Sequence, residues 1–294
     1  MGYNFETLAL HAGLDSGSEP PSRAIPVHRT TAYNFRDTTH AANLFALKEL
    51  GYIYTRLQNP TQGVLEERLA ALDGGTAALA LASGTSAVFY SIINIARAGD
   101  RVVASKYLYG GTFTMFNDIL PQFGIDVDFV DPLKPDEVQS AISPKTRALF
   151  AETIGNPALV VPDFEQLADI AHKARIPFIV DATFTTPYLL KPIEHGVDIV
   201  VHSLTKWMGG HGTGIGGAIV DGGRFDWDDP KFVSMVEPDG SYHGVRFAKD
   251  LGDLTPMAYA LRMRLVPLRN LGAAISPDNA WMFLQGIETL PLRM

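Results

Sequence analysis

Apolar runs of strand length alternate with helical stretches through the middle of the chain. Runs that predict strands cover residues 76–82, 101–105, 125–130, 147–152, 176–181, 197–202 and 215–220, and helical spacing recurs near 86–97, 112–122, 135–142 and 163–174. Near-continuous apolar strands separated by amphipathic helices predict an α/β fold, a mostly parallel seven-stranded sheet with helices on both faces. Ligands of such sheets bind beyond the carboxyl ends of the strands, where Ser83, Asp181 and Ser203 lie.

The two ends of the chain have different patterns. Residues 1–60 lack regular periodicity and are rich in Pro, Thr and aromatic residues, which predicts an extended segment that wraps a neighbouring subunit. A helical pattern follows, with Thr61 as the expected N-cap and Gly74 at its end, and opens an α/β domain over 61–250. The pattern is helical again over 251–294, where we expect a linking helix and the beginning of a C-terminal domain that is truncated or not included in this sequence.

Composition and charge exclude several classes of function. The 294 residues include no cysteine, so disulfides and thiolate metal sites are excluded, and the histidines form no metal pair at helical spacing. The net charge of -8 argues against nucleic acid as a partner. No uncharged apolar stretch approaches the roughly 20 residues of a membrane span, and the N-terminus does not resemble a secretion signal. We therefore expect a cytoplasmic protein without a membrane or a metal partner.

One lysine stands out by its surroundings. Lys206 follows two hydroxyl residues, Ser203 and Thr205, at the end of an apolar strand. Its apolar neighbours Leu204, Trp207 and Met208 indicate a partly desolvated site, which favours a nucleophilic amine. A solitary lysine is more often a solvated surface charge, so a second signal is needed.

Asp181 supplies the second signal, because it ends another apolar strand with a carboxylate. Such a carboxylate is commonly a helix cap or a turn former. Beside a Schiff-base lysine, however, a carboxylate can keep a pyridine nitrogen protonated, and this pairing is the recurring contribution of proteins that bind pyridoxal 5'-phosphate (PLP). Lys206 and Asp181 together therefore predict PLP as the cofactor.

A phosphate site is predicted where a strand leads into a helix at Ser83-Gly84-Thr85. Backbone amides at a helix N-terminus are unsatisfied and favour an anion, although a plain N-cap turn would have the same sequence. Ser203 and Thr205 can add hydroxyl donors from the adjacent strand end. These donors favour the phosphate interpretation.

Three further residues are candidates for contact with the cofactor. Tyr109 precedes the pair Gly110-Gly111 and can lie flat over a planar heteroaromatic ring. Tyr54 and Arg56 lie on one side of an extended segment, and an arginine fork suits phosphate. The alternatives are a core tyrosine and a surface ion pair.

As a set, these residues resemble one family, the Cys/Met-metabolism PLP enzymes. The matching motifs are Tyr54-x-Arg56-x-x-Asn59-Pro-Thr, Ser83-Gly-Thr, Tyr109-Gly-Gly-Thr, Asn156-Pro, Asp181-Ala-Thr183-Phe and Ser203-Leu-Thr-Lys206. The resemblance implies a fold-type I transferase and a homotetramer built from dimers that share active sites. In this arrangement Tyr54 and Arg56 reach the phosphate of the neighbouring subunit's cofactor. It also implies that Asn156 and Thr183 contact the cofactor.

The resemblance implies a γ-replacement, in which an O-acylated homoserine exchanges its acyl group for sulfide or a thiol. Lys206, Tyr109, Tyr54 and Asp181 are then the catalytic residues. Related alternatives are γ-elimination by a lyase, of the methionine or cystathionine γ-lyase type, and the cystathionine γ-synthase reaction. A non-enzymatic alternative is a PLP-binding subunit that is inactive because it lacks the arginine that clamps the substrate carboxylate.

The sequence assigns no residue to that clamp. In the family the arginine belongs to a further C-terminal domain. None of the late arginines lies in a matching motif, namely Arg262, Arg264, Arg269 and Arg293.

Overall fold

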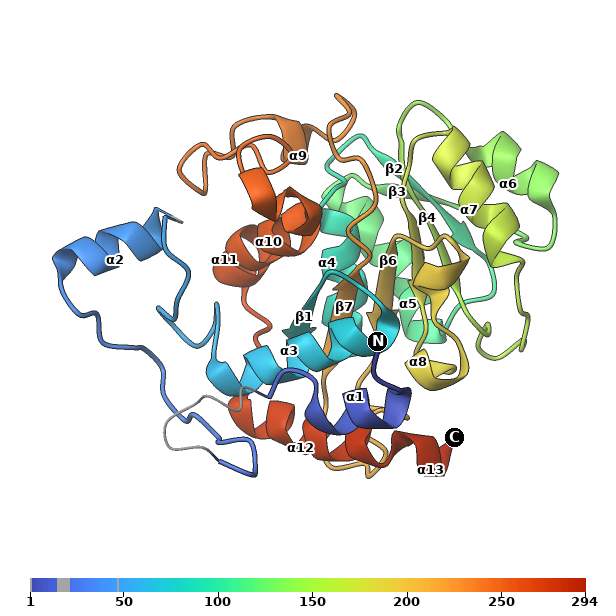
Figure 1. Ribbon diagram of the computed structural model, residues 1–294. Helices are drawn as coiled ribbons and strands as arrows, with labels where there is room; N and C mark the ends of the chain where they lie inside the picture. The colour runs from blue at the N-terminus through green and yellow to red at the C-terminus, as the bar shows by residue number, and fades with distance from the viewer. Residues whose placement is uncertain (1, 15–21, 47) are drawn as a thin grey trace.

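A seven-stranded sheet forms the centre of the computed structural model, which describes residues 2–14, 22–46 and 48–294 (Figure 1). The strands are β1 (Ala77–Leu81), β2 (Arg101–Ser105), β3 (Asp126–Val130), β4 (Thr146–Glu152), β5 (Phe178–Asp181), β6 (Ile199–His202) and β7 (Gly217–Asp221). Their order is β1-β7-β6-β5-β4-β2-β3, with β7 antiparallel to both neighbours and every other pair parallel. The mostly parallel seven-stranded sheet predicted from the sequence is confirmed.

Helices cover both faces of this sheet. The α-helices are α1 (Phe5–His11), α2 (Thr38–Phe45), α3 (Pro60–Asp73), α4 (Gly84–Ile93), α5 (Gly110–Thr114), α6 (Pro135–Ala141), α7 (Phe164–Lys173), α8 (Thr186–Leu189), α9 (Val233–Val236), α10 (Ala258–Met263), α11 (Arg269–Leu271), α12 (Pro277–Glu288) and α13 (Leu290–Arg293). Shorter turns of 3-10 helix are η2 (Leu120–Phe123), η3 (Pro192–His195) and η4 (Gly252–Met257), and η1 (Met115–Ile119) and η5 (Arg264–Leu268) are π-helical.

Two apolar cores hold these layers together, because alternate residues of a strand point to opposite faces. Val180 and Val200 pack into the core beneath α3, α7 and α12. Ile179 and Val201, their neighbours in sequence, pack into the core beneath α4 and α10. Because both faces of the sheet are covered, the strand sequences are continuous apolar runs. The ends of the strands are where the sheet reaches solvent.

The first helix of the α/β domain begins earlier than we predicted. Asn59, rather than Thr61, is the N-cap of α3, because its side-chain oxygen accepts the Thr61 N–H at 2.9 Å and Pro60 occupies the first helical position. The predicted end is confirmed, since Gly74 caps the helix in the left-handed conformation at φ 75°. Thr61 has a different role, donating its hydroxyl to the Pro26 carbonyl at 2.8 Å.

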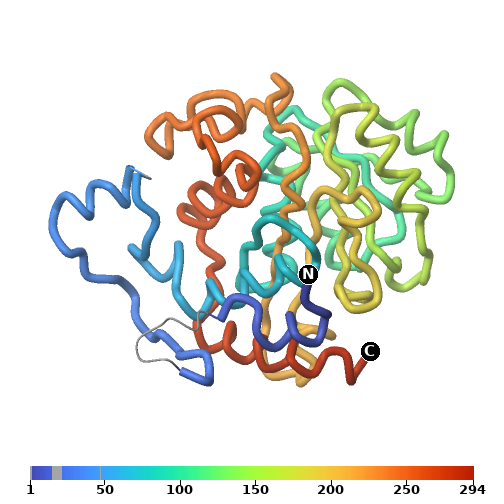
Figure 2. The backbone as a smooth tube through the Cα atoms, in the orientation of Figure 1, coloured from blue at the N-terminus to red at the C-terminus, as the bar shows by residue number. Residues whose placement is uncertain are grey.

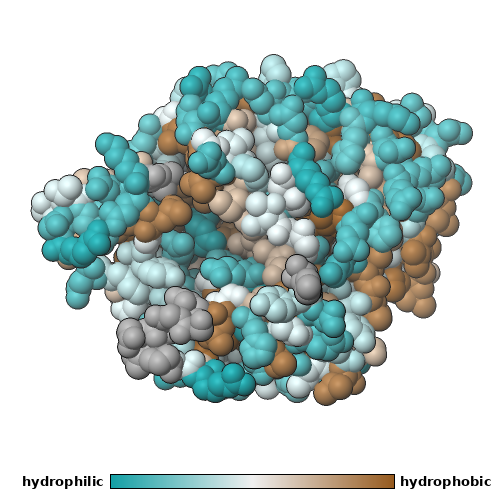
Figure 3. All heavy atoms as spheres, in the orientation of Figure 1, coloured by the Kyte–Doolittle hydropathy of each residue, from teal (hydrophilic) through white to brown (hydrophobic). Residues whose placement is uncertain are grey.

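The N-terminal segment 1–60 is less extended than its sequence predicted, since it contains α1 and α2. α1 lies beside α12 on the body of the molecule. Residues 22–46 and 48–58, which we call the arm, begin beside α3 and then project from that body, with α2 near the tip (Figure 1 and Figure 2). Figure 3 shows that the arm is mostly hydrophilic on the face drawn there. The arm nevertheless exposes several large apolar side chains, namely Phe35, Phe45, Leu50, Tyr52 and Tyr54.

The last part of the described chain is helical, as its pattern predicted. Leu265 and Leu268 of this region pack into the core beneath α4 and α10. α12 covers the opposite face of the sheet and contacts α3. Within the described ranges, the helices are too short or too polar for any of them to cross a membrane.

Candidate active site

A cavity of about 680 Å³ lies at the edge of the sheet where β4, β5 and β6 end. Ten of the twelve residues that the sequence singled out line it, namely Ser83, Gly84, Thr85, Tyr109, Asn156, Asp181, Thr183, Ser203, Thr205 and Lys206. They come from five separate segments of the chain. The fold therefore brings together residues up to about 120 positions apart, as expected for a site at the carboxyl ends of parallel strands.

Lys206 lies in the loop between β6 and β7, and its side chain is exposed to the cavity. The expected apolar surroundings are present only in part. Leu204 and Met208 are buried in the core, whereas Trp207 is exposed and lines the cavity with the lysine. The buried side chains of Leu204 and Met208 anchor the loop on either side of Lys206 and leave its amine accessible.

Thr205 braces this loop against the chain that leads into β7. Its hydroxyl oxygen accepts the Gly216 N–H at 3.1 Å and donates to the Gly216 carbonyl at 3.2 Å. The Lys206 N–H donates to the Ser203 carbonyl at 3.2 Å. The lysine therefore lies on a loop whose two sides are bonded to each other.

Asp181 ends β5 and faces the cavity with its carboxylate. One of its oxygens accepts the Thr183 N–H at 2.8 Å, and the Thr183 hydroxyl in turn accepts the Ser203 N–H at 2.7 Å. The surrounding protein desolvates the carboxyl and raises its pKa, while the bond from Thr183 opposes this shift. A cation beside Asp181 would remove that penalty, so the site favours a protonated ring nitrogen.

A buried ion pair lies behind Asp181. His202 and Asp73 are both fully buried, and His202 Nε2 lies 2.8 Å from Asp73 Oδ2. Burial alone would lower the pKa of His202, but Asp73 and Asp181 raise it above its usual value. A positively charged His202 between two carboxylates stabilises the ionised form of Asp181.

The N-terminus of α4 forms another wall of the cavity, beside the end of β6. Ser83 caps the helix by accepting the Ser86 N–H at 3.0 Å, so the plain capping role considered for this residue is present as well. A Cβ on Gly84 would lie 2.6 Å from the Ser203 Cβ, so only glycine allows the helix to approach the end of β6. This close approach places the first amides of α4 beside the hydroxyls of Ser203 and Thr205.

Glu152 is a cavity residue to which sequence reasoning gave no role. It ends β4 as Asp181 ends β5, and the two residues are paired in the register of these strands. Its oxygens accept the Tyr109 N–H at 2.6 Å and the Asn156 N–H at 3.1 Å. Burial, followed by the charge of Asp181, raises the pKa of Glu152 to about 8, although the two hydrogen bonds oppose the shift. A carboxylate at the end of an apolar strand was the signal that could have identified it.

Tyr54 and Arg56 do not line the cavity of their own chain. The Arg56 guanidinium lies over the Tyr54 ring, 4.9 Å from its centroid, and donates to the Arg269 carbonyl at 3.0 Å. Both side chains lie at the root of the arm. The structure therefore separates these two candidates from the other ten.

The late arginines also lie outside the cavity lining. Arg262 is buried and bonded to Asn94, whereas Arg264 pairs with Glu66 at 2.6 Å. Arg293 of α13 donates to the carbonyls of Trp207 and Gly286. Among the described residues that line the cavity, Lys206 is the basic one.

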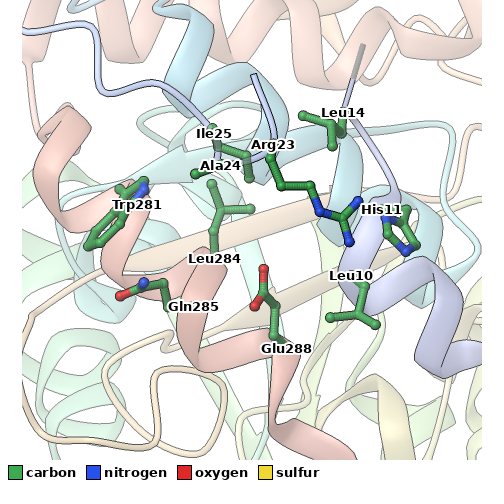
Figure 4. Close-up of a pocket in the computed structure, with 10 residues that line it drawn as sticks. All are labelled: Leu10, His11, Leu14, Arg23, Ala24, Ile25, Trp281, Leu284, Gln285 and Glu288. Atoms are coloured by element: carbon green, nitrogen blue, oxygen red, sulfur yellow. The ribbon is translucent and has the colours of Figure 1, made fainter. Parts of the chain in front are cut away.

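A smaller cavity of about 300 Å³ lies elsewhere, between α1, α12 and the beginning of the arm (Figure 4). Figure 4 shows His11, Arg23 and Glu288 around it, together with the apolar side chains of Leu284 and Trp281. None of the predicted site residues lines it. The chemistry predicted from the sequence is therefore gathered in the larger cavity.

Comparison with known proteins assigns the chain to a family. The model of the Cys/Met metabolism PLP-dependent enzymes matches residues 6–294. The chain belongs to this family. The O-acetyl-L-homoserine sulfhydrylase of Leptospira meyeri is 52% identical over 301 residues, which cover 100% of this chain and 68% of the relative. The homocysteine synthase of Schizosaccharomyces pombe is 49% identical over 294 residues, 99% of this chain and 68% of the relative.

Solved structures lead to the same family. A structure described as an O-acetylhomoserine (thiol)-lyase from Campylobacter jejuni has a TM-score of 0.94 at 40% identity, covering 99% of this chain and 72% of that one. It contains an N'-pyridoxyl-lysine-5'-monophosphate residue. The fold-type I architecture implied by the sequence resemblance is thus confirmed. The chain spans about two thirds of the length of the curated relatives it matches.

The cavity residues fit the cofactor of this PLP-dependent family. An amine, a carboxylate and a helix N-terminus converge on one cavity, and a glycine allows the close approach that a phosphate cradle needs. Desolvation raises the pKa of the buried Asp181 even with His202 behind it, so a pyridinium on the cavity side would stabilise its ionised form. The predicted cofactor is consistent with each of these features.

Proposed function

We propose that this protein catalyses a PLP-dependent γ-replacement, in which O-acetylhomoserine reacts with sulfide or a thiol to give homocysteine or methionine. The proposal rests on one observation, that Lys206, Asp181 and the N-terminus of α4 line the same cavity. Two relatives near 50% identity with sulfhydrylase and homocysteine synthase names support the choice of reaction within the family. This reaction is a step of methionine biosynthesis and cysteine metabolism.

Lys206 and Asp181 have the central roles in this proposal. Bound PLP supplies the electron sink that stabilises negative charge at the substrate Cα. Lys206 holds the cofactor covalently and, once released, moves protons at Cα and Cβ of the substrate as general base and acid. Asp181 keeps the ring nitrogen protonated, assisted by His202 behind it. Tyr109 stacks on the ring and shares proton transfer with Tyr54.

The remaining cavity residues bind the cofactor. We assign the phosphate to the first amides of α4 at Gly84 and Thr85 and to the hydroxyls of Ser83, Ser203 and Thr205. Asn156 and Thr183 then contact the ring. These donors would hold the cofactor beside Lys206, and such positioning is a large part of catalysis.

Tyr54 and Arg56 complete the site from a neighbouring subunit in this proposal. Their distance from the cavity of their own chain and the projection of the arm support this assignment. Arg56 then binds the phosphate with its planar fork, as a partner in a homotetramer of active-site-sharing dimers. We also propose three parts of the chain, namely an arm-bearing segment 1–60, a PLP domain 61–250 and a C-terminal segment 251–294. The proposed location of the protein is the cytoplasm.

Product analysis distinguishes the candidate activities. The full chain is incubated with O-acetylhomoserine, with and without sulfide. We expect homocysteine only when sulfide is present, whereas 2-oxobutyrate in both reactions would identify a γ-elimination lyase. Cysteine in place of sulfide tests for a cystathionine γ-synthase. The absence of product in every reaction, despite bound PLP, would support the inactive subunit.

A further inference from the structure

The carboxylate of Glu152 has no role in the proposed mechanism, although it faces the same cavity as Asp181. Both residues end neighbouring parallel strands, and their Cα atoms are paired in the register of β4 and β5. Only 6% of Glu152 is exposed. A buried carboxyl group beside a second carboxyl group is costly, so its contacts should explain why it is there.

Two cavity walls depend on this side chain. Glu152 accepts the Tyr109 N–H with one oxygen at 2.6 Å and the Asn156 N–H with the other at 3.1 Å. Tyr109 precedes α5, whereas Asn156 follows β4, so the two walls belong to segments 47 positions apart in the chain. One carboxylate thereby fixes the spacing between the backbones of Tyr109 and Asn156, from which their side chains extend.

Other contacts hold Tyr109 weakly. It is the N-cap of α5, a helix of 5 residues, and its side chain makes no capping bond. Its ring is 52% exposed and lies against Gly111, where an added Cβ would come within 2.7 Å of the ring. The bond to Glu152 is therefore the contact that ties the backbone of Tyr109 to the rigid sheet.

We propose that Glu152 is a positioning residue for the cofactor, holding Tyr109 and Asn156 against the two sides of the cavity from the end of β4. This inference rests on the proposed function. Glutamate suits the task because both of its partners are N–H donors, and a carboxylate accepts with both oxygens. Glutamine would turn an NH2 donor toward one of the two N–H groups and would leave that group unpaired.

The electrostatics of the pair agree with this role. Burial and, to a smaller extent, the neighbouring carboxylate of Asp181 together raise the pKa of Glu152 to about 8, while the N–H groups of Tyr109 and Asn156 oppose the shift. Desolvation also raises the pKa of Asp181. The two carboxyl groups therefore titrate together, and the N–H groups of Tyr109 and Asn156 favour the ionised Glu152, which accepts with both oxygens.

Three variants of the full chain test the role of Glu152. Glu152→Gln keeps the size of the side chain and removes one acceptor, while Glu152→Asp keeps both acceptors but shortens their reach. Asp221→Asn is the matched control, because Asp221 is also buried and accepts one backbone N–H with each oxygen, from Gly223 at 2.9 Å and from Ala260 at 3.3 Å, outside the cavity. For each variant we would measure the apparent PLP dissociation constant and the visible circular dichroism per cofactor covalently bound.

We expect Glu152→Gln to weaken PLP binding by about tenfold or more, the effect of one unpaired buried N–H group. The circular dichroism per bound cofactor should fall as well, because the ring loses its fixed orientation. A purely structural role would lower occupancy or stability without changing the signal of each bound cofactor. Glu152→Asp should show the same changes to a smaller degree, and Asp221→Asn should show neither.

Wild-type affinity and dichroism in both Glu152 variants would overturn the positioning role and leave the proposed function intact. If Glu152→Gln does not fold, Glu152→Asp decides in the same way, because it keeps the charge. If the wild-type chain itself binds no PLP at Lys206, the proposed function fails, and the positioning role fails with it.

Discussion

The cavity and the arm differ in what holds their functional residues in place. Asp181 and Glu152 end strands that are buried on both faces, and each is bonded to the backbone of an adjoining segment. Tyr54 and Arg56 instead contact each other and one carbonyl of α11. The comparison indicates that one chain preorganises most of the site, and it fits our proposal that the arm residues work at the site of a neighbouring subunit.

Among the cavity residues, replacement of Lys206 should reduce turnover the most. Lys206→Ala should abolish the borohydride-stable link to PLP and reduce turnover by at least about 10³-fold, because the covalent anchor and the proton carrier are both lost. Mass spectrometry of the reduced, digested protein checks the site of attachment. Lys191→Ala, a surface lysine near Glu194, is the control and should retain the link. Label on another lysine would refute the assignment.

Asp181→Asn should keep the fold and reduce turnover by about 100-fold, the scale of one well-placed electrostatic group. The amide cannot hold the ring nitrogen protonated. Asp221→Asn is a matched control, because Asp221 is a buried carboxylate that accepts the Gly223 N–H at 2.9 Å, but it lies at the opposite edge of the sheet. Turnover of Asp181→Asn within a few-fold of wild type would disprove the pyridinium role.

The arm is tested by mixing two inactive proteins. Arg56→Ala should weaken PLP binding by about tenfold, and Arg56→Lys by less, because lysine keeps the charge without the bidentate fork. When Arg56→Ala and Lys206→Ala subunits exchange, about a quarter of all sites should contain both intact residues, and that share of activity should return.

Verified exchange without recovery of activity would mean that Arg56 and Lys206 act within one chain. The arm would then have no role in a neighbouring site. The cavity residues and the arm residues would then differ only in how exposed their side chains are.

A smaller effect on PLP binding is expected at Gly84, where α4 packs closely against the end of β6. Gly84→Ala would push its Cβ within 2.6 Å of the Ser203 Cβ, so α4 must shift away from the phosphate site. We expect PLP binding to weaken by about three- to tenfold, because the amides of the helix N-terminus move out of line. Gly240→Ala is the control, since no atom lies within 4 Å of an added Cβ there. Equal affinities in equilibrium titrations would show that α4 tolerates the displacement.

The smallest effect concerns a core carboxylate outside the cavity. Burial raises the pKa of Asp221 to about 7, with a minor contribution from Asp198. A carboxyl group whose folded pKa is raised contributes stability below its unfolded pKa and loses it as the pH rises through 7. The unfolding temperature should therefore fall by a few degrees between about pH 5 and pH 8. Asp221→Asn should flatten this dependence, whatever its effect on stability at one pH.

Much of this arrangement could be predicted from the sequence. The seven strands were predicted within about two residues, since continuous apolar runs are typical of strands buried on both faces. Ser83, Asp181 and Ser203 followed from the rule that strand ends carry the chemistry, whereas Asn156 and Thr183 followed only from the resemblance to the family. Asp181 was a clear candidate because a charged residue directly after Phe178–Val180 needs a partner or a function.

Other features of the structure could not be predicted from the order of apolar and polar residues. The antiparallel direction of β7 could not be predicted, because an apolar run is the same in both directions. The exposure of Lys206 was missed because its apolar neighbours were assumed to surround it, whereas Leu204 and Met208 point into the core. Short helices such as α2 depend on caps, here Asp37 and the His40 N–H at 2.7 Å, more than on periodicity.

The position of β7 has a consequence for the growing chain on the ribosome. Within the described residues, β1 pairs with no strand except β7, which begins 140 residues later. At about 5–20 residues per second, β1 waits on the order of 7–28 s for this partner. Its unpaired edge is meanwhile open to other chains. The wall that bears Ser83 and Gly84 follows β1 directly, so it reaches its place only when nearly all of the sheet has been synthesised.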